Sequence, residues 1–249
     1  MSFIQTDTYA VRGYECDASG QLSVPTLMNW MQESANRNAI DYGIGIDDLV
    51  QKNLGWMLMR FRLQMHHYPR YGESVRVVTY PTFVEKYFIY RDFRILADDD
   101  TLLAEATSTW LVFDLAKRVM APLPGFIREL NVPTGIIPQP KLALKPDFLT
   151  ATWPIPNQQD VSVTVNWFSI DQNQHVNNVA YIQWLLEATD KTVLQTRKLT
   201  ELDVLYRTES HWRDQLLIQS APVQSDTNLH RIRQTETGRE VLLAQTRWQ

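Results

Sequence analysis

The sequence has a single cysteine, Cys16, among 249 residues. One thiol excludes an internal disulfide and any metal cluster held by several cysteines. No apolar run approaches the ~18 residues that a transmembrane helix needs. The N-terminal stretch MSFIQTDTYAVRGYE has neither the basic and apolar regions of a signal peptide nor the Arg/Ser-rich composition of a transit peptide. These absences favour a cytoplasmic protein.

Several binding and catalytic signatures are also missing. The chain contains no GxSxG, GxGxxG or GxxxxGK[ST] motif. The formal net charge of −4 does not favour a nucleic-acid partner. The composition, 44% hydrophobic and 21% charged, is that of a globular protein with ample material for a core. This length allows one large domain or two of about 120 residues.

The prolines indicate a boundary between two domains. Eight of the twelve prolines fall between positions 122 and 156. Proline removes a backbone donor and disfavours helix in the residue before it, so this stretch is a poor helix or strand. It is too apolar for a flexible tether. We therefore expect an N-terminal domain over 1–121, an ordered linker over 122–158 and a C-terminal domain over 159–249.

The two flanking halves resemble each other. The segment DASGQLSVPTLMNWMQES (17–34) aligns with DQNQHVNNVAYIQWLLEA (171–188) at an offset of 154. The aligned identities are Asp17 with Asp171, Trp30 with Trp184, and Glu33 with Glu187. Further on, YPRYGESVRVVTY aligns with ESHWRDQLLIQSA and AEATSTW with LLAQTRW, while the offset falls to 138. The shared order predicts an internal duplication.

Each half is predicted to begin with one long helix. In the first half, Ser23 suits the N-cap, Pro25 the first turn, and Gly43 the end. In the second half, Asn177 or Asn178 caps a helix that we expect over 178–195, since apolar residues recur there at helical spacing.

Strand-like runs follow each predicted helix. In the first half they are WMLMRFRLQM, SVRVVTYPTFV, YFIYRDFRILA and TSTWLVFDL; in the second, DVLYRTES, QLLIQSAPV, LHRIRQTE and VLLAQTRW. Alternation of apolar and polar residues, with turns such as ADDDT and TETGR, indicates antiparallel strands. The predicted fold is α+β: two copies of a long helix wrapped by a curved antiparallel sheet.

A polar cluster precedes the second helix. Asp171, Asn173 and His175 are spaced by two, so in an extended segment their side chains project to one side. The helix start beside them, at Asn177 and Asn178, offers unpaired N–H groups that stabilise an oxyanion. Together these groups suit hydrolysis of an activated carbonyl. Taken singly, however, such residues are more often turn, cap or surface residues.

A metal site is not expected from the spacing of the histidines. His175 with Asp171 gives too few ligands, and HxxxH and HxH are absent. The adjacent His66 and His67 point to opposite faces of a strand. We also expect no cofactor.

The pattern DxNxHVNNxxYIxWLLE, followed by YRTES, resembles the acyl-acyl carrier protein thioesterases of the plant-type and bacterial group. The N-terminal half is similar too, in VRGYECDASGQLSVPTLMNWMQESA and LGWMLMRFRLQMHHYPRYGESVRVVTYP. The resemblance implies two hot-dog domains in tandem. It also implies hydrolysis of a fatty acyl thioester on the phosphopantetheine arm of acyl carrier protein. Plant members carry a transit peptide, so a chain without one suggests a bacterial cytoplasmic enzyme.

The resemblance also implies the site residues. The family's catalytic positions fall on Asp171, Asn173, His175 and Glu209. A cysteine once proposed as the family's nucleophile is replaced here by Ser210, which favours water as the nucleophile. The expected mechanism has Glu209, with Asp171 and His175, deprotonating that water. Asn173 and the helix start then stabilise the oxyanion.

The first half lacks these groups. Opposite Asn173, His175 and Glu209 stand Ser19, Gln21 and Tyr68. In the family this half houses the acyl chain. Its candidate lining residues are apolar, although such residues are more often plain core: Leu27, Trp30, Met31, Trp56, Met59 and Trp110.

Two other functions remain open from the sequence. One is hydrolysis of acyl-coenzyme A, although hot-dog enzymes of that class are commonly single-copy chains. The other is a non-hydrolytic acyl-binding module, which would not need the four polar residues together. Two hot-dog units in one chain allow either a monomer or a homodimer.

Overall fold

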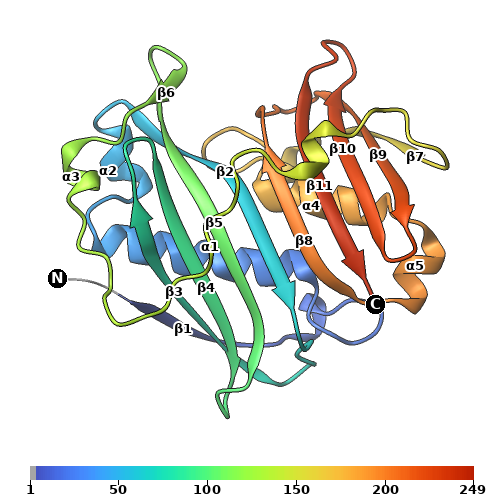
Figure 1. Ribbon diagram of the computed structural model, residues 1–249, viewed down its shortest axis with the longest axis horizontal. Coiled ribbons are helices and arrows are strands. Elements are labelled where there is room, and N and C mark those ends of the chain that lie inside the picture. The colour runs from blue at the N-terminus through green and yellow to red at the C-terminus, as the bar shows by residue number, and fades with distance from the viewer. Residues whose placement is uncertain (1–3) are drawn as a thin grey trace. The chain divides into compact units, whose positions relative to one another are not determined.

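The computed structural model describes residues 4–249, so the first three residues of the predicted 1–121 domain lie outside the described residues. The chain forms two compact units, the first ending at Leu142 and the second spanning Ala143–Gln249 (Figure 1). The predicted linker, 122–158, is divided between the two units, and its limits stay a prediction. Its short helix α3, Gly125–Arg128, adds Ile127 to the core of the first unit.

The main helix of the first unit, α1, spans Val24–Asp41, as predicted. It starts there because the Ser23 hydroxyl accepts the N–H of Thr26 at 3.3 Å, with proline in the first turn. It ends before Gly43, whose φ of +68° suits a glycine. Its apolar face, which includes Leu27 and Met31, is buried. That face packs against strands β1 and β3.

The sheet of the first unit is antiparallel. Its strands are β1 (Gln5–Ala10), β2 (Leu54–Met65), β3 (Ser74–Val84), β4 (Phe88–Ala97), β5 (Leu102–Asp114) and β6 (Val119–Ala121). Their order is β1-β3-β4-β5-β2, with β6 paired to β5. Two short helices complete the unit, η1 (Gly13–Glu15) and α2 (Ile46–Val50). The four predicted runs of this half are confirmed as strands, whereas β1 and β6 were not predicted.

The second unit repeats this plan. Its strands are β7 (Gln159–Thr164), β8 (Leu199–Tyr206), β9 (Gln215–Gln224), β10 (Thr227–Gln234) and β11 (Glu240–Trp248), in the order β8-β11-β10-β9-β7. Two 3-10 turns, η2 (Asp147–Thr150) and η3 (Trp167–Ser169), precede its helix. That helix, α4 (Asn178–Glu187), packs against β9 and β10. The predicted run 203–210 is only partly strand, because β8 ends at Tyr206.

The prediction of a single helix over 178–195 is wrong. The segment forms two helices, α4 and then α5 (Lys191–Thr196). Asp190 separates them because its carboxylate accepts the N–H of Thr192 at 2.8 Å and so caps a new helix. A short acidic side chain that binds nearby backbone competes with helix continuation.

Matching hydrogen bonds in the two units confirm the internal duplication. The N–H of Asp17 donates to the Gln21 carbonyl, as the N–H of Asp171 does to that of His175, at 2.7 and 2.8 Å. Likewise, the N–H of Leu22 donates to Pro69, and that of Val176 to Ser210, at 2.8 and 2.9 Å. Because Pro69 and Ser210 are equivalent, the residues before them, Tyr68 and Glu209, are equivalent too.

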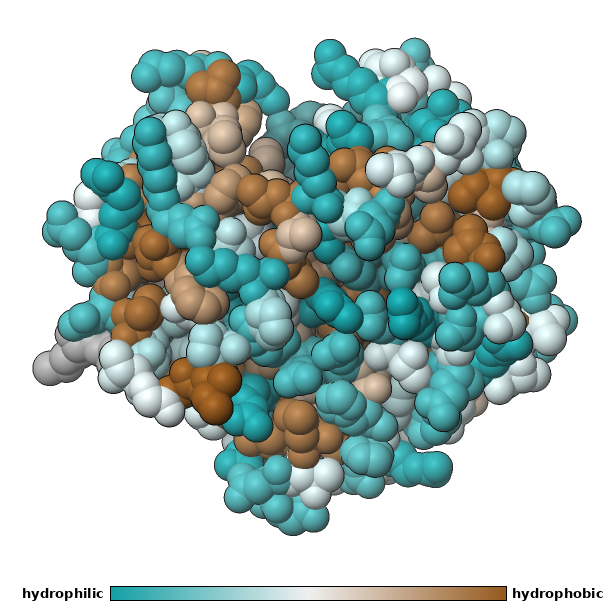
Figure 2. Space-filling view, viewed as in Figure 1, coloured by the Kyte–Doolittle hydropathy of each residue, from teal (hydrophilic) through white to brown (hydrophobic). Residues whose placement is uncertain are grey.

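On the face drawn in Figure 2, hydrophilic residues predominate and hydrophobic residues appear in small separate groups. Over residues 4–249, no helix is both long enough and apolar enough to cross a membrane.

Candidate active site

A tight turn over residues 171–175 presents His175. The Asp171 carboxylate holds this turn, because its Oδ1 accepts the N–H of Asn173 at 2.8 Å and that of His175 at 3.4 Å. The Asn173 side-chain amide donates to Oδ2 at 3.4 Å. Gln174 completes the turn with a φ of +65°. The Asp171 carboxylate therefore binds mainly the backbone N–H groups of its own turn.

The same turn occurs in the first unit without the histidine. The Asp17 Oδ1 accepts the N–H groups of Ser19 and Gln21 at 2.8 and 3.2 Å. The first unit thus keeps the aspartate that closes this turn, although it lacks the asparagine and the histidine of the polar cluster. The retained Asp17 is explained by local structure, and the same local role belongs to Asp171.

His175 and Glu209 come together across the unit. Val176 pairs with Ser210 through its backbone N–H, which sets the segment after β8 beside the 171–175 turn. The His175 Nε2 and Glu209 Oε2 lie 3.2 Å apart, and the two side chains are 33% and 25% exposed. A carboxylate and an imidazole at this distance, both partly exposed to solvent, can bind and deprotonate a water molecule.

Ser210 is not presented to solvent, since its exposed fraction is 0%. It lies against the hydroxyl of Tyr181, and burial raises the pKa of that phenol, which keeps it protonated. A fully buried serine beside a neutral phenol lacks both the access and the adjacent base that a nucleophile requires. The site geometry therefore agrees with water, rather than Ser210, as the attacking group.

His211 also belongs to this cluster, although it was not predicted from the sequence. Its ring lies 5.1 Å from that of His175 at an interplanar angle of 78°. Ligand atoms of His175, Glu209 and His211 all lie within 4.8 Å of one another. From the sequence, only Asp171 was considered as a ligand beside His175, so a metal site was not expected. The nearness of His211 to Glu209 in the chain was the available signal, because alternate residues of an extended segment share a side.

The two asparagines at the start of α4 have local roles. The Asn177 Oδ1 accepts the N–H of Val179 at 2.9 Å, which makes Asn177 the N-cap, as predicted. The carbonyl of Asn178 accepts the Tyr206 hydroxyl at 3.3 Å. One donor at the helix start is therefore already occupied by Asn177.

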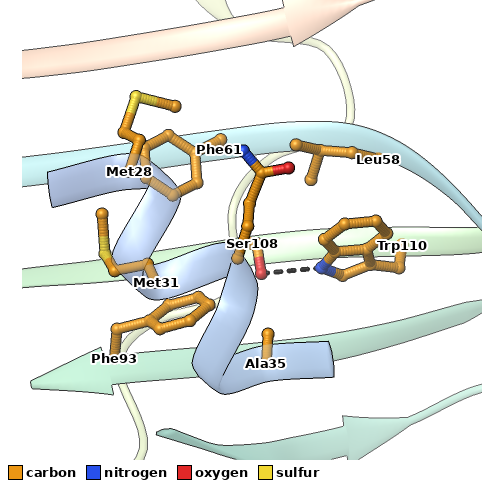
Figure 3. A pocket seen from close by; sticks show the side chains of 9 residues that line it. Met28, Met31, Ala35, Leu58, Phe61, Phe93, Ser108 and Trp110 are labelled. Atoms are coloured by element: carbon orange, nitrogen blue, oxygen red, sulfur yellow. Dashed lines mark hydrogen bonds between the residues drawn. The ribbon is translucent and has the colours of Figure 1, made fainter. Parts of the chain in front are cut away.

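A pocket in the first unit lies between α1 and the sheet (Figure 3). Its volume is about 20 Å³, roughly room for one water molecule. Most of its lining is apolar: Met28, Met31, Ala35, Leu58, Phe61, Phe93 and Trp110, with Gln32 and Ser108. The Trp110 indole donates to the Ser108 hydroxyl at 2.9 Å. Long flexible methionines on one wall can move to admit a larger group.

Of the predicted lining residues, Met31 and Trp110 line this pocket and the other four do not. Leu27 is core, 1% exposed, and Trp30 stacks on Tyr9 at 4.8 Å. The Trp56 indole donates to the Ile44 carbonyl at 2.8 Å and packs against a separate cluster. Met59 lies at a register shift of β2, where the pairing with β5 passes from Leu58 directly to Arg60.

Comparison with known families covers both units. Residues 3–130 match the model described as "Acyl-ACP thioesterase N-terminal domain", and residues 154–249 match "Acyl-ACP thioesterase C-terminal domain". The palmitoyl-acyl carrier protein thioesterase, chloroplastic, of Gossypium hirsutum is 30% identical over 98% of this chain. The dodecanoyl-[acyl-carrier-protein] hydrolase, chloroplastic, of Umbellularia californica is 26% identical over 97%. This chain spans 63% and 66% of the lengths of those two relatives.

Two solved structures share the fold. An acyl-ACP thioesterase from Bacteroides thetaiotaomicron aligns with a TM-score of 0.81 at 24% identity, covering 99% of this chain and 98% of that one. The 12:0-ACP thioesterase from Umbellularia californica aligns with a TM-score of 0.81 at 23% identity, covering 99% and 97%. The expected tandem hot-dog fold is thereby confirmed.

Proposed function

The chain belongs to the acyl-ACP thioesterase family, and from this premise we propose that it hydrolyses fatty acyl thioesters of acyl carrier protein. The products are the free fatty acid and the carrier protein. The observation that carries the proposal is the pair of His175 and Glu209 at 3.2 Å, in the unit that matches the family's C-terminal domain.

Water is the nucleophile in the proposed mechanism, and Glu209 is its base. The Glu209 Oε2 lies 3.2 Å from His175 Nε2 in a partly exposed site, where the carboxylate accepts a proton from water. His175 holds the carboxylate in place and stabilises its charge. The water attacks the thioester carbonyl while Glu209 takes its proton. The C–S bond of the tetrahedral intermediate then breaks, and the departing sulfur of the phosphopantetheine arm takes that proton from Glu209 and leaves as the thiol. A positioned base of this kind contributes about 10²–10⁴-fold to the rate.

Asp171 acts as a positioning residue in this scheme, not as the base. Its Oδ1 is already bound to the N–H groups of Asn173 and His175. Asn173 is assigned to the oxyanion, because its side-chain amide has only a long bond to Asp171, 3.4 Å, that it can exchange for a charged oxygen. An oxyanion donor typically contributes about 10²–10³-fold.

The pocket in the first unit is assigned to the acyl chain. Its walls are apolar, and the methionines Met28 and Met31 on α1 provide an adaptable side. With a volume of about 20 Å³, the pocket must widen to hold more than a methyl-sized group.

The direct test is release of free thiol from acyl-acyl carrier protein and acyl-coenzyme A substrates of equal chain length. We expect a kcat/KM at least about tenfold higher on the carrier-protein substrate, since docking to the carrier adds binding energy in the transition state. Preference for the coenzyme A thioester would replace this function by acyl-coenzyme A hydrolysis. Release from neither, with binding of the acyl chain retained, would make the chain a non-hydrolytic module.

A further inference from the structure

We propose that His175, Glu209 and His211 form a binding site for a divalent transition-metal ion, best fitted by Zn²⁺, and that the bound ion blocks the proposed hydrolysis. Ligand atoms of the three side chains lie within 4.8 Å of one another. Two of these atoms, His175 Nε2 and Glu209 Oε2, are 3.2 Å apart.

The donor set matches zinc chemistry. Two imidazoles and one carboxylate form a familiar three-ligand set for Zn²⁺, with a fourth position left to water. Bonds of about 2.0–2.2 Å in a tetrahedron place neighbouring ligand atoms roughly 3.3–3.6 Å apart. The His175 Nε2 and Glu209 Oε2, at 3.2 Å, are already close to that separation. His211 is exposed, so a rotation of its side chain brings the third ligand into range without moving the core.

The first unit shows that this cluster is not a consequence of the fold. Gln21 and Tyr68 occupy the positions of His175 and Glu209, and the backbone of Gln21 pairs with Arg70. Arg70 corresponds to His211, because the N–H of each donates to an acidic side chain three residues on, Glu73 or Asp214. An amide, a phenol and a guanidinium do not form a zinc site. The three ligands are therefore particular to the second unit.

Metal binding and base catalysis require the same carboxylate, that of Glu209. A Zn²⁺ ion takes up the lone pair of a histidine nitrogen and the charge of the carboxylate. Glu209 bound to the ion cannot accept a proton from water in the way proposed above. The metal site itself stands on geometry alone, whereas the blocking role rests on the proposed function.

The test begins with ZnCl₂ binding to the full chain, measured by isothermal titration calorimetry without any substrate. We expect one saturable site in the wild type, and binding weakened at least about tenfold in His211→Ala and in Glu209→Gln. His66→Ala is the matched control, because His66 is a half-exposed histidine that lies 3.9 Å from another carboxylate, Glu105. It should bind like the wild type. No saturable site, or equal binding by His211→Ala and wild type, would overturn the metal site.

The second measurement is the ratio of thiol-release rates with and without ZnCl₂, taken for each variant so that changes in basal turnover cancel. The proposal predicts inhibition of the wild type and of His66→Ala, and at least about tenfold more ZnCl₂ for the same inhibition of His211→Ala. A rate that rises or stays constant while the site fills would overturn the blocking role. Zn²⁺ binding by a chain that hydrolyses neither thioester would overturn the proposed function and the blocking role, but would support the metal site.

Discussion

Asp171 is expected to position His175 through its backbone bonds, and the first unit supplies an internal control for that role. Asp171→Ala removes the acceptor for two N–H groups, those of Asn173 and His175. Asp17→Ala removes the equivalent bonds in the first unit, to Ser19 and Gln21. Hydrogen bonds to charged groups are worth about 1.5–3 kcal/mol each when buried. Both turns are at least partly exposed, so we expect a loss of about 1–2 kcal/mol in the free energy of unfolding for either variant.

The turnover rate should distinguish the Asp171 variant from the Asp17 variant. In Asp171→Ala the loosened turn misplaces His175, and a displacement of about 1 Å at a reacting group costs on the order of 10²-fold. Asp17→Ala should keep wild-type turnover. Asp171→Asn keeps an oxygen acceptor suited to this turn, so it should retain turnover within about tenfold of the wild type.

The assay pairs urea unfolding with thiol release for all three variants. Asp171→Asn decides the question, because an amide can close the turn but cannot accept a proton from water. If Asp171→Asn were as slow as Asp171→Ala while unfolding like the wild type, the carboxylate would be part of the proton transfer and the positioning role would be refuted.

Two further predictions concern buried polar residues, and a third concerns the pocket lining. Burial lowers the pKa of His230 to about 3, so below about pH 6.5 only the unfolded chain binds this proton, and about 2 kcal/mol of stability is lost between pH 7 and 5. In urea unfolding, the loss of stability between pH 7 and 5 should be smaller by about 2 kcal/mol in His230→Gln than in the wild type. The same loss in both proteins would contradict this prediction. Burial also lowers the pKa of Arg91 to about 10, and its guanidinium donates to Asn38 at 2.8 Å, so Asn38→Leu should cost about 2–3 kcal/mol in urea unfolding, and a loss under about 0.5 would count against this. Trp110→Ala widens the pocket and should raise kcat/KM for longer over shorter acyl chains by about tenfold or more, whereas Trp56→Ala, outside the pocket, should leave the preference unchanged.

Local patterns account for most of the fold that could be predicted from the sequence. The cap at Ser23, the alternation along the strands and the proline cluster each act over a few residues, where sequence is informative. Strand β7, Gln159–Thr164, was missed because nearly all of it is exposed and its apolar alternation is limited to two valines, Val161 and Val163. The break at Asp190 was missed because apolar residues continue at helical spacing beyond it, although Asp190 caps the start of a new helix.

The same distinction between local patterns and long-range pairing decides which site residues could be predicted. Asp171, Asn173 and His175 could be found because one contiguous turn contains them. Glu209 needed the family resemblance, since only the pairing of Val176 with Ser210 brings it to His175. For His211 the signal was its position two residues after Glu209, which places both side chains on one side of an extended segment.

The pocket lining was only partly predictable. The register shift at Met59 changes which residues of β2 face α1, so Leu58 rather than Met59 lines the pocket. Such a shift depends on pairing with β5 and leaves no mark in the spacing of apolar residues.

The most direct test of the central claim is turnover of Glu209→Gln on an acyl-acyl carrier protein substrate. The amide preserves the size of the side chain but cannot accept a proton from water. The proposed mechanism predicts a kcat at least about 10²-fold below that of the wild type, with the same midpoint of urea unfolding. Near wild-type turnover in this variant would contradict the assignment of Glu209 as the base.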